Sequence, residues 1–209
     1  LGDTFWVHDE VKGHFKYNSF FASASCRTAL ANGDADFTTS HFYEIPTVLH
    51  DVIKPRVSIV SVCPPDENGY VSLGTSVDFI ESTLHYCDVK IAQVNKYVPR
   101  AQGRAVKHIS EFDYFVEIDE PLLELPSAPL TDVERAIGKN CASLINDGDC
   151  LQLGIGGIPN AICEELKNKK DLGLHSEMVS DGVVDLIKSG VINNSKKQTH
   201  KGVTILTFA

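Results

Sequence analysis

The 209-residue sequence lacks a surplus of basic residues. It has 19 lysines and arginines against 28 aspartates and glutamates, which gives a formal net charge of −9 at pH 7. A nucleic-acid-binding protein needs a basic surface that neutralises phosphates, so this balance argues against that class. A small anionic ligand is not excluded, because the N-terminus of a helix can bind an anion inside an acidic protein.

Long apolar runs and paired cysteines are also absent from the sequence. No stretch reaches about 18 consecutive apolar residues and no signal peptide is visible, so we expect no membrane-spanning helix. The six cysteines include no CxxC pair and the histidine spacing suits no obvious ligand set, so we expect no metal site. Three disulfides are conceivable, but the sequence favours reduced thiols buried in a cytoplasmic protein.

The ends of the sequence are unusual for a complete protein. The chain begins without Met, and it stops at residues 203–208 (VTILTF), which have the composition of a buried strand. Because a domain seldom ends on a core strand, we expect the chain to be an internal piece of a longer polypeptide.

The first part of the chain predicts several strands ahead of a linker. β-branched and aromatic residues predict strands at residues 56–62, 88–94 and 112–118, the first of them buried on both faces. Residues 76–87 have helical spacing. Residues 121–130 contain three prolines and no clear period, which predicts a domain boundary there.

The second part begins with a strongly predicted helix. Thr131 and Glu134 have the spacing of a capping box, and Gly148 can end the helix. One helical face is predicted to carry the buried residues Val133, Ile137, Cys141, Leu144 and Ile145.

Strands and helices then alternate to the end of the chain. Strands are predicted at residues 150–154, 172–176 and 203–208, and helices at 160–170 and 180–190. This alternation predicts an α/β fold with open, mainly parallel sheets and helices on both faces, in Rossmann-like layers. Ligands of such sheets bind beyond the carboxyl ends of the strands.

Residues 154–159 (GIGGIP) form a glycine-rich loop between a predicted strand and a predicted helix. Three glycines in four residues let the backbone approach a ligand closely with its N–H groups exposed, and the helix dipole favours an anion there. A tight turn alone would not need three glycines. A dinucleotide-binding loop would have glycine where Pro159 stands, so a dehydrogenase is disfavoured.

Glu177 follows the next predicted strand, within LGLHSEMVSDG (172–182), and should lie at the same sheet edge as the glycine loop. The simpler interpretation is a carboxylate that caps the following helix, worth about 0.3–1 kcal/mol. The alternative is a nucleophile that faces the amide donors of the loop, one of which accounts for ~3–4 kcal/mol of barrier in acyl transfer. A glutamate is already ionised at pH 7, so His175 is not needed as a base and is expected to pack.

Three stretches, residues 62–76, 151–162 and 172–186, together resemble the acetyl-CoA hydrolase/transferase family. The resemblance covers essentially the whole chain and implies a CoA-transferase-like fold. It makes residues 1–125 the C-terminal part of the N-terminal CoA-transferase domain, and residues 131–209 the start of the second such domain. Family chains are considerably longer, so an N-terminal stretch and most of the C-terminal half would lie outside this sequence.

The resemblance also implies a set of site residues. Glu177 becomes the covalent nucleophile, and the loop of Gly154, Gly156 and Gly157 faces it, with Gln152 beside the site. A family loop near the site corresponds to Pro64, Pro65, Asp66 and Gly69, which we expect to shape that loop.

The activity that the resemblance implies is transfer of coenzyme A between a short-chain acyl-CoA and a carboxylic acid of the 4-hydroxybutyrate, butyrate or acetate type. It proceeds by a ping-pong mechanism through a glutamyl-CoA thioester. Coenzyme A is then a substrate, and no cofactor is bound permanently. The implied partners are the two substrates, the remainder of the polypeptide and further copies of the chain in a homo-oligomer. Two alternatives stay open: acyl-CoA hydrolysis by the same glutamate, and a non-catalytic CoA-binding fragment.

Overall fold

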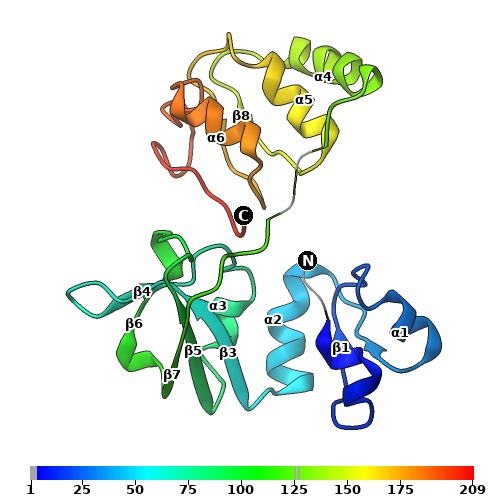
Figure 1. Ribbon diagram of the computed structural model, residues 1–209. Coiled ribbons are helices and arrows are strands. Elements are labelled where there is room, and N and C mark those ends of the chain that lie inside the picture. The colour runs from blue at the N-terminus through cyan, green and yellow to red at the C-terminus, as the bar shows by residue number, and fades with distance from the viewer. Residues whose placement is uncertain (1–3, 125, 127) are drawn as a thin grey trace.

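The computed structural model describes residues 4–124, 126 and 128–209, which form two units (Figure 1). The first unit contains β1 (Asn18–Ser19), α1 (Arg27–Asn32), β2 (Asp36–Phe37), α2 (Ile45–Thr47) with a π-helical continuation (Val48–Ile53), β3 (Val57–Val62), β4 (Tyr70–Ser72), α3 (Ile80–Thr83), β5 (Val89–Asn95), β6 (Val106–His108) and β7 (Tyr114–Ile118). The second contains α4 (Asp132–Leu144), β8 (Cys150–Leu151), α5 (Gly157–Glu165), β9 (Gly173–Leu174) and α6 (Asp181–Lys188). Short 3-10 turns occupy Phe5–Val7, Asp9–Val11, Phe42–Glu44, Gly103–Ala105 and Ile109–Glu111.

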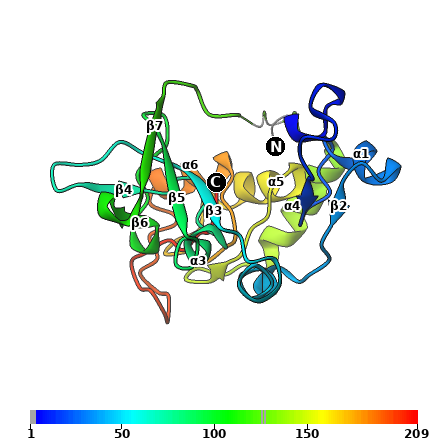
Figure 2. The ribbon, with the colours of Figure 1, turned by 90° about the horizontal axis from the view of Figure 1, so that it is seen from below.

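The main sheet of the first unit is parallel, with the strand order β3-β5-β7 (Figure 2). These are the three strands that the sequence predicts, and their parallel pairing confirms the α/β class. β4 and β6 form a separate antiparallel pair. The helix predicted at residues 76–87 is only one turn long, but Val77, Ile80 and Leu84 do pack together in the core.

One face of the parallel sheet is uncovered. Along β3 exposed and buried residues alternate, and Ile59 keeps 69% of its surface accessible while Val60 is buried. Tyr114 lies on the same face as Ile59, because both pair in register with Ile91, and it is exposed too. The expectation that this strand is buried on both faces is therefore wrong, because the core cluster covers only the face that carries Val60.

A buried carboxylate ties α3 to the antiparallel pair. Glu81 is 5% exposed, and its oxygens accept hydrogen bonds from Lys107 at 2.9 Å, His85 at 3.0 Å and Arg104 at 2.5 Å. Burial alone would raise the pKa of Glu81, but the hydrogen bonds of Lys107 and His85 and the charges of Lys107 and Arg104 outweigh burial and hold that pKa at about 2. Lys107 is itself buried, so each group of the pair needs the other.

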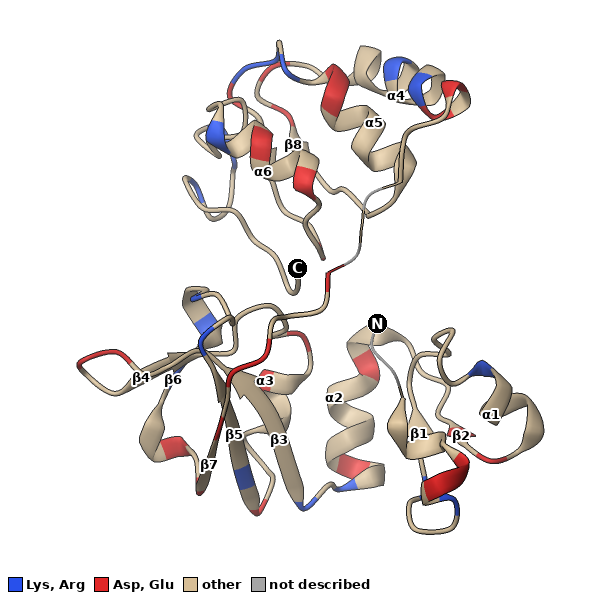
Figure 3. Ribbon diagram, viewed as in Figure 1, with Lys and Arg blue, Asp and Glu red and all other residues tan. Residues whose placement is uncertain are grey.

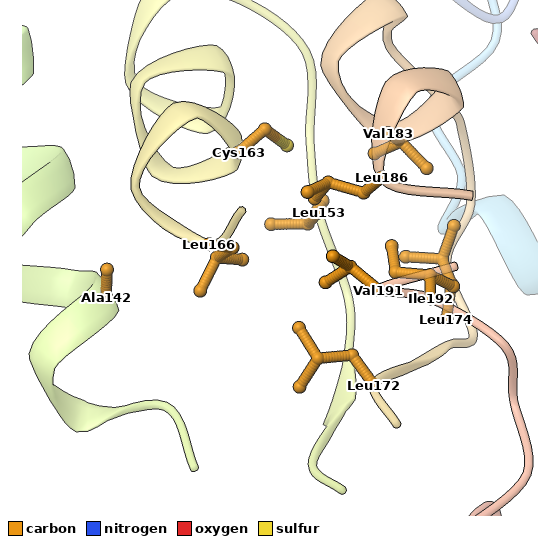
Figure 4. Packing of buried hydrophobic residues seen from close by; sticks show 10 residues of the cluster. All are labelled: Ala142, Leu153, Cys163, Leu166, Leu172, Leu174, Val183, Leu186, Val191 and Ile192. Atoms are coloured by element: carbon orange, nitrogen blue, oxygen red, sulfur yellow. The ribbon is translucent and has the colours of Figure 1, made fainter. Parts of the chain in front are cut away.

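The second unit is built on two parallel strands, in which Cys150 pairs with Gly173 and Leu151 with Leu174. Both strands are shorter than the sequence predicts. Beside them α5 and α6 enclose one apolar cluster (Figure 4). Its buried members are Ala142, Leu153, Cys163, Leu166, Leu172, Leu174, Val183, Leu186, Val191 and Ile192.

Small residues bring α4 and α5 together, and the two helices lie side by side in both views (Figures 1 and 2). A Cβ at Gly138 would stand 2.7–2.8 Å from the backbone and Cβ of Ala161. The buried face of α4 therefore differs from the predicted one. Gly138 and Ala142 are buried against α5, whereas Leu144 is 80% exposed and Val133 is also exposed. Predicting the buried face from large apolar residues therefore placed Val133 and Leu144 wrongly.

Gly138→Val is expected to destabilise the chain, because the added side chain has to separate two helices already in backbone contact. Overpacking of this kind lowers the free energy of unfolding by about 1–3 kcal/mol. Urea unfolding followed by circular dichroism measures the change. The control is Ala136→Val, on the exposed face of α4. A glycine such as Gly190 would not serve, because its positive φ would itself make a substitution unfavourable. Equal losses in the two variants would contradict the close packing of α4 against α5.

The last residues form an extended segment rather than a regular strand. Ile205 and Phe208 make isolated parallel bridges with His175 and Met178, and Val203 is exposed. The expected buried strand is therefore wrong in detail: Ile205 bonds to the backbone of Leu174 and Ser176, and the side chains of Asn194 and Lys197 also bind the Leu174 amide and carbonyl, but no regular strand forms.

The same segment joins the two units, and the C-terminus lies between them (Figure 1). Val77 donates to the carbonyl of Thr207, and Ala209 donates to the carbonyl of Thr75, both at 2.9 Å. Ser76 also forms an antiparallel bridge with Phe208. The loop after β4 is thereby fastened to the second unit.

The six cysteines are all free thiols. Four are buried, Cys141 is half-buried and Cys150 is exposed, so the expectation of burial does not hold for Cys150. Burial raises the pKa of Cys163 to about 11, which keeps this thiol protonated at neutral pH. Among the described residues, no helix has both the length and the apolar character needed to cross a membrane.

Candidate active site

The glycine loop leaves the carboxyl end of β8 and turns into α5, as the sequence predicts. Gly156 precedes the helix with a φ of 108°, a conformation that strongly favours glycine. Gly157 is the first residue of α5 and Pro159 its third. The first amides of a helix have no partner within it, so those of Gly157 and Ile158 are available at this N-terminus.

An acidic side chain that sequence reasoning assigned only to capping lies beside this loop. Glu134 accepts hydrogen bonds from N and Oγ1 of Thr131, both at 2.7 Å, which confirms the capping box and lowers the pKa of Glu134. A side chain at residue 157 would collide with the Glu134 carboxylate. Gly157 is therefore required for helix packing, whatever else it does.

Glu177 lies beyond the carboxyl end of β9, with an exposed side chain. Its backbone is held firmly from one side. The Glu177 carbonyl accepts hydrogen bonds from the amides of Thr207 at 2.9 Å and Phe208 at 3.1 Å, and from Oγ1 of Thr207 at 2.6 Å. Three donors on one carbonyl oxygen fix the peptide from which the carboxylate projects.

The carboxylate of Glu177 does not cap α6. The N-cap position of that helix is Ser180, and the acidic residue of its first turn is Asp181. Among the residues that the structure describes, no donor forms a hydrogen bond with the Glu177 carboxylate, which leaves it free for another partner. The hydroxyl of Ser180 makes no capping hydrogen bond.

Ser176 joins the loop of Glu177 to the glycine loop. This buried residue donates from Oγ to the carbonyl of Leu153 at 2.6 Å and accepts from the Leu153 amide at 3.1 Å. Leu153 precedes Gly154 and Ser176 precedes Glu177, so the two predicted loops meet at one sheet edge. Gly154 and Glu177 are each the next residue after this pair, as the strand order implied.

Ser176→Ala is expected to lower the free energy of unfolding by about 1–3 kcal/mol, because the backbone amide and carbonyl of the buried Leu153 both lose their partner. Urea unfolding tests this. Ser143→Ala, which removes an exposed hydroxyl bonded within its own helix, is the control and should change little. A loss no larger than that of the control would show that the two loops are held by other contacts.

The remaining predicted site residues have different positions. Gln152 is exposed on the strand end before the glycine loop, and its side chain has no hydrogen-bond partner among the described residues. Asp66 shapes its own loop, as expected: it accepts from the amides of Asn68 at 3.0 Å and Tyr70 at 2.9 Å. The bond from the Tyr70 amide is the main cause of the lowered pKa of Asp66.

Sequence reasoning missed the residues that connect these parts. Thr207 bridges the two units, because it bonds the Glu177 carbonyl and accepts from Val77. Gly74 sets the loop that reaches Thr207: its φ is 63°, and a Cβ there would meet Val98 and the carbonyl of Pro99. The only sequence signal was the GTS that ends the stretch 62–76.

Comparisons with known proteins show the family of the chain. The family model of the acetyl-CoA hydrolase/transferase N-terminal domain matches residues 2–124. The 4-hydroxybutyrate coenzyme A transferase of Clostridium kluyveri is 46% identical over 209 residues, which are all of this chain and 49% of that protein. The succinyl-CoA:cyclohexane-1-carboxylate CoA transferase of Geobacter metallireducens is 46% identical over 94% of this chain and 45% of its own length.

Solved structures give the same result. The crystal structure of RipA from Yersinia pestis superposes with a TM-score of 0.92 at 35% identity, covering 98% of this chain and 49% of that one. The chain therefore spans about half the length of the curated relatives it matches. By its matched domain, its identity to these relatives and its fold, the chain belongs to the acetyl-CoA hydrolase/transferase family.

Proposed function

We propose that this chain carries the nucleophile of a CoA-transferase, which moves coenzyme A between a short-chain acyl-CoA and a carboxylic acid. The observation that carries the proposal is Glu177: an exposed carboxylate without a hydrogen-bond partner among the described residues, held by its backbone at a strand end beside a glycine loop. A carboxylate whose backbone is held in place, and whose oxygens bind no other group among the described residues, is suited to act as a nucleophile.

In the proposed reaction a Glu177 oxygen attacks the thioester carbonyl carbon of the acyl-CoA. The carbon–sulfur bond breaks, the CoA thiolate leaves and a mixed anhydride remains. The thiolate then attacks the glutamyl carbonyl, which releases the first carboxylate and leaves a glutamyl-CoA thioester. A second carboxylate runs these steps in reverse. In this proposal amides of the loop that contains Gly154, Gly156 and Gly157 stabilise the oxyanions, and Gln152 contributes beside them.

Relatives at equal identity carry different acids in their names, so the acyl group stays open between 4-hydroxybutyrate, butyrate, acetate and other acids. We further propose that a longer polypeptide completes the site, because the chain spans about half of its relatives. The same proposal divides the chain into domains at residues 1–125 and 131–209 and makes coenzyme A a substrate rather than a resident cofactor. It also includes a homo-oligomeric assembly and a cytoplasmic location.

The test is peptide mass mapping of the full-length protein after incubation with butyryl-CoA or acetyl-CoA. A CoA-sized adduct on the peptide that contains Glu177 is the expected result. Turnover that needs an added carboxylate supports transfer. Turnover in water alone would instead indicate acyl-CoA hydrolysis, for which the exposure of Glu177 gives an argument. CoA binding without any adduct would leave only a binding domain.

A further inference from the structure

A buried lysine lies under the strand that leads to Glu177. Lys197 is 6% exposed, and its Nζ donates to the carbonyls of Leu174 at 2.9 Å and Val203 at 2.7 Å. Its aliphatic stem crosses Gly173, where a Cβ would stand 2.6 Å from Cγ of Lys197. The absence of a side chain at residue 173 therefore makes room for the lysine.

Asn194 completes the contact from the same turn. This residue is buried with a φ of 58°; its Oδ1 accepts from the Leu174 amide at 2.9 Å, and its Nδ2 donates to Oγ1 of Thr204 at 2.9 Å. The backbone amide and the backbone carbonyl of Leu174 are thus both bound by buried side chains. The same two side chains hold Val203 and Thr204.

Packing alone does not account for a lysine at position 197, because burying its charge costs free energy. Among the described residues no carboxylate forms an ion pair with it, and two carbonyl dipoles compensate a buried ammonium only in part. An apolar side chain of similar length would fill the space at lower desolvation cost. The ammonium joins the carbonyl of Leu174 in β9 to the carbonyl of Val203, beside the links that Asn194 and the Ile205 backbone make, and an apolar side chain could not make this link.

That link leads directly to the proposed nucleophile. The segment that begins at Val203 continues to Thr207 and Phe208, whose three donors hold the Glu177 carbonyl. β9, on the other side, runs through Leu174 to Ser176 and Glu177. Residues 203–208, which hold the Glu177 carbonyl, are called the clamp below. Lys197 therefore fixes the spacing between the strand that leads to Glu177 and the clamp.

We propose that Lys197 is a positioning residue for Glu177, setting the strand and the clamp at the separation that acyl transfer requires. The inference rests on the proposed function, and it names a residue that does not touch the substrate. Lys197→Met in the full-length protein keeps the stem and removes the donor. Its kcat is expected to fall by about 10- to 100-fold, because small misplacements of a reacting group have effects of that size. The KM for acyl-CoA should stay within about twofold, since Lys197 makes no part of the loop that faces substrate.

Hydrogen exchange supplies a readout that needs no activity. The amide of Ser176 donates to Ile205, and that of His175 to Leu151. In Lys197→Met the exchange of the Ser176 amide should accelerate, while that of His175, on the β8 side, changes less. Lys201→Met, four residues away on the exposed turn, is the control for both measurements.

Gly173→Ala is a second variant for the case that Lys197→Met does not fold. Its methyl group displaces the lysine stem and should give the same loss of kcat with the lysine retained. Unchanged kcat and unchanged Ser176 exchange in the folded variants overturn the inference. So does a loss of activity that only follows the folded fraction. If the wild-type protein forms no adduct, the transferase proposal fails, and the exchange measurement still decides whether Lys197 holds the strand to the clamp.

Discussion

Glu177→Gln in the full-length protein is expected to lower kcat by about 10⁴-fold or more and to abolish the CoA adduct. The amide is nearly the same size, but it cannot attack a thioester as a carboxylate does. Folding should be unaffected, because the Glu177 side chain is exposed and its backbone contacts are kept. Steady-state transfer rates with saturating carboxylate measure the effect.

Two companion variants make this result specific. Glu177→Asp keeps the carboxylate but withdraws it by one methylene, and a loss of about 10²-fold is expected from misplacement alone. Glu165→Gln removes an exposed carboxylate at the end of α5 and should leave the rate unchanged. Equal activities of Glu177→Gln and Glu165→Gln would end the case for Glu177 as nucleophile.

Glu81→Gln is expected to lower the free energy of unfolding by about 3–5 kcal/mol, because it leaves the buried ammonium of Lys107 without a counter-charge. Urea unfolding at neutral pH provides the measurement. Asp88→Asn is the matched control within the same unit, since its ion pair with Arg56 is exposed and should be worth less than about 1 kcal/mol. Similar losses in both variants would show that Glu81 is not the electrostatic centre of its cluster.

Acid unfolding tests the same cluster by an independent route. The pKa of Glu81 is depressed from 4.5 to about 2 in the folded chain. Its contribution to stability is therefore fully present above pH 4.5 and is lost as the pH falls toward 2. Unfolding free energy should decline through this window in the wild type, and the decline should be shallower in Glu81→Gln.

The parts of the fold that depend on local pattern were predictable from sequence. The strands β5 and β7 and the capping box of Thr131 follow from residue type and spacing. The predictions were wrong where a contact with a residue far away in the chain determines which side chains are buried. Gly138 is buried because Ala161 lies opposite it, and no pattern within α4 reveals that contact.

The candidate site shows the same division. The meeting of the glycine loop with Glu177 follows from strand order, because both loops leave the carboxyl ends of adjacent parallel strands. Ser176, Lys197 and Thr207 could not be found in this way. Their roles depend on hydrogen bonds between residues that lie 23 to 30 positions apart in the chain, and such bonds leave no periodic trace in the sequence.

The uncovered sheet face also affects the solubility of the isolated chain. Ile59 and Tyr114 present apolar surface to water on the parallel sheet, which favours association between molecules. Acidic residues are spread over both units (Figure 3), and the net charge of −9 opposes that association by repulsion. Salt screens the repulsion but not the apolar attraction. The solubility of the chain on its own should therefore fall as ionic strength rises, unlike that of a protein whose sheet is covered.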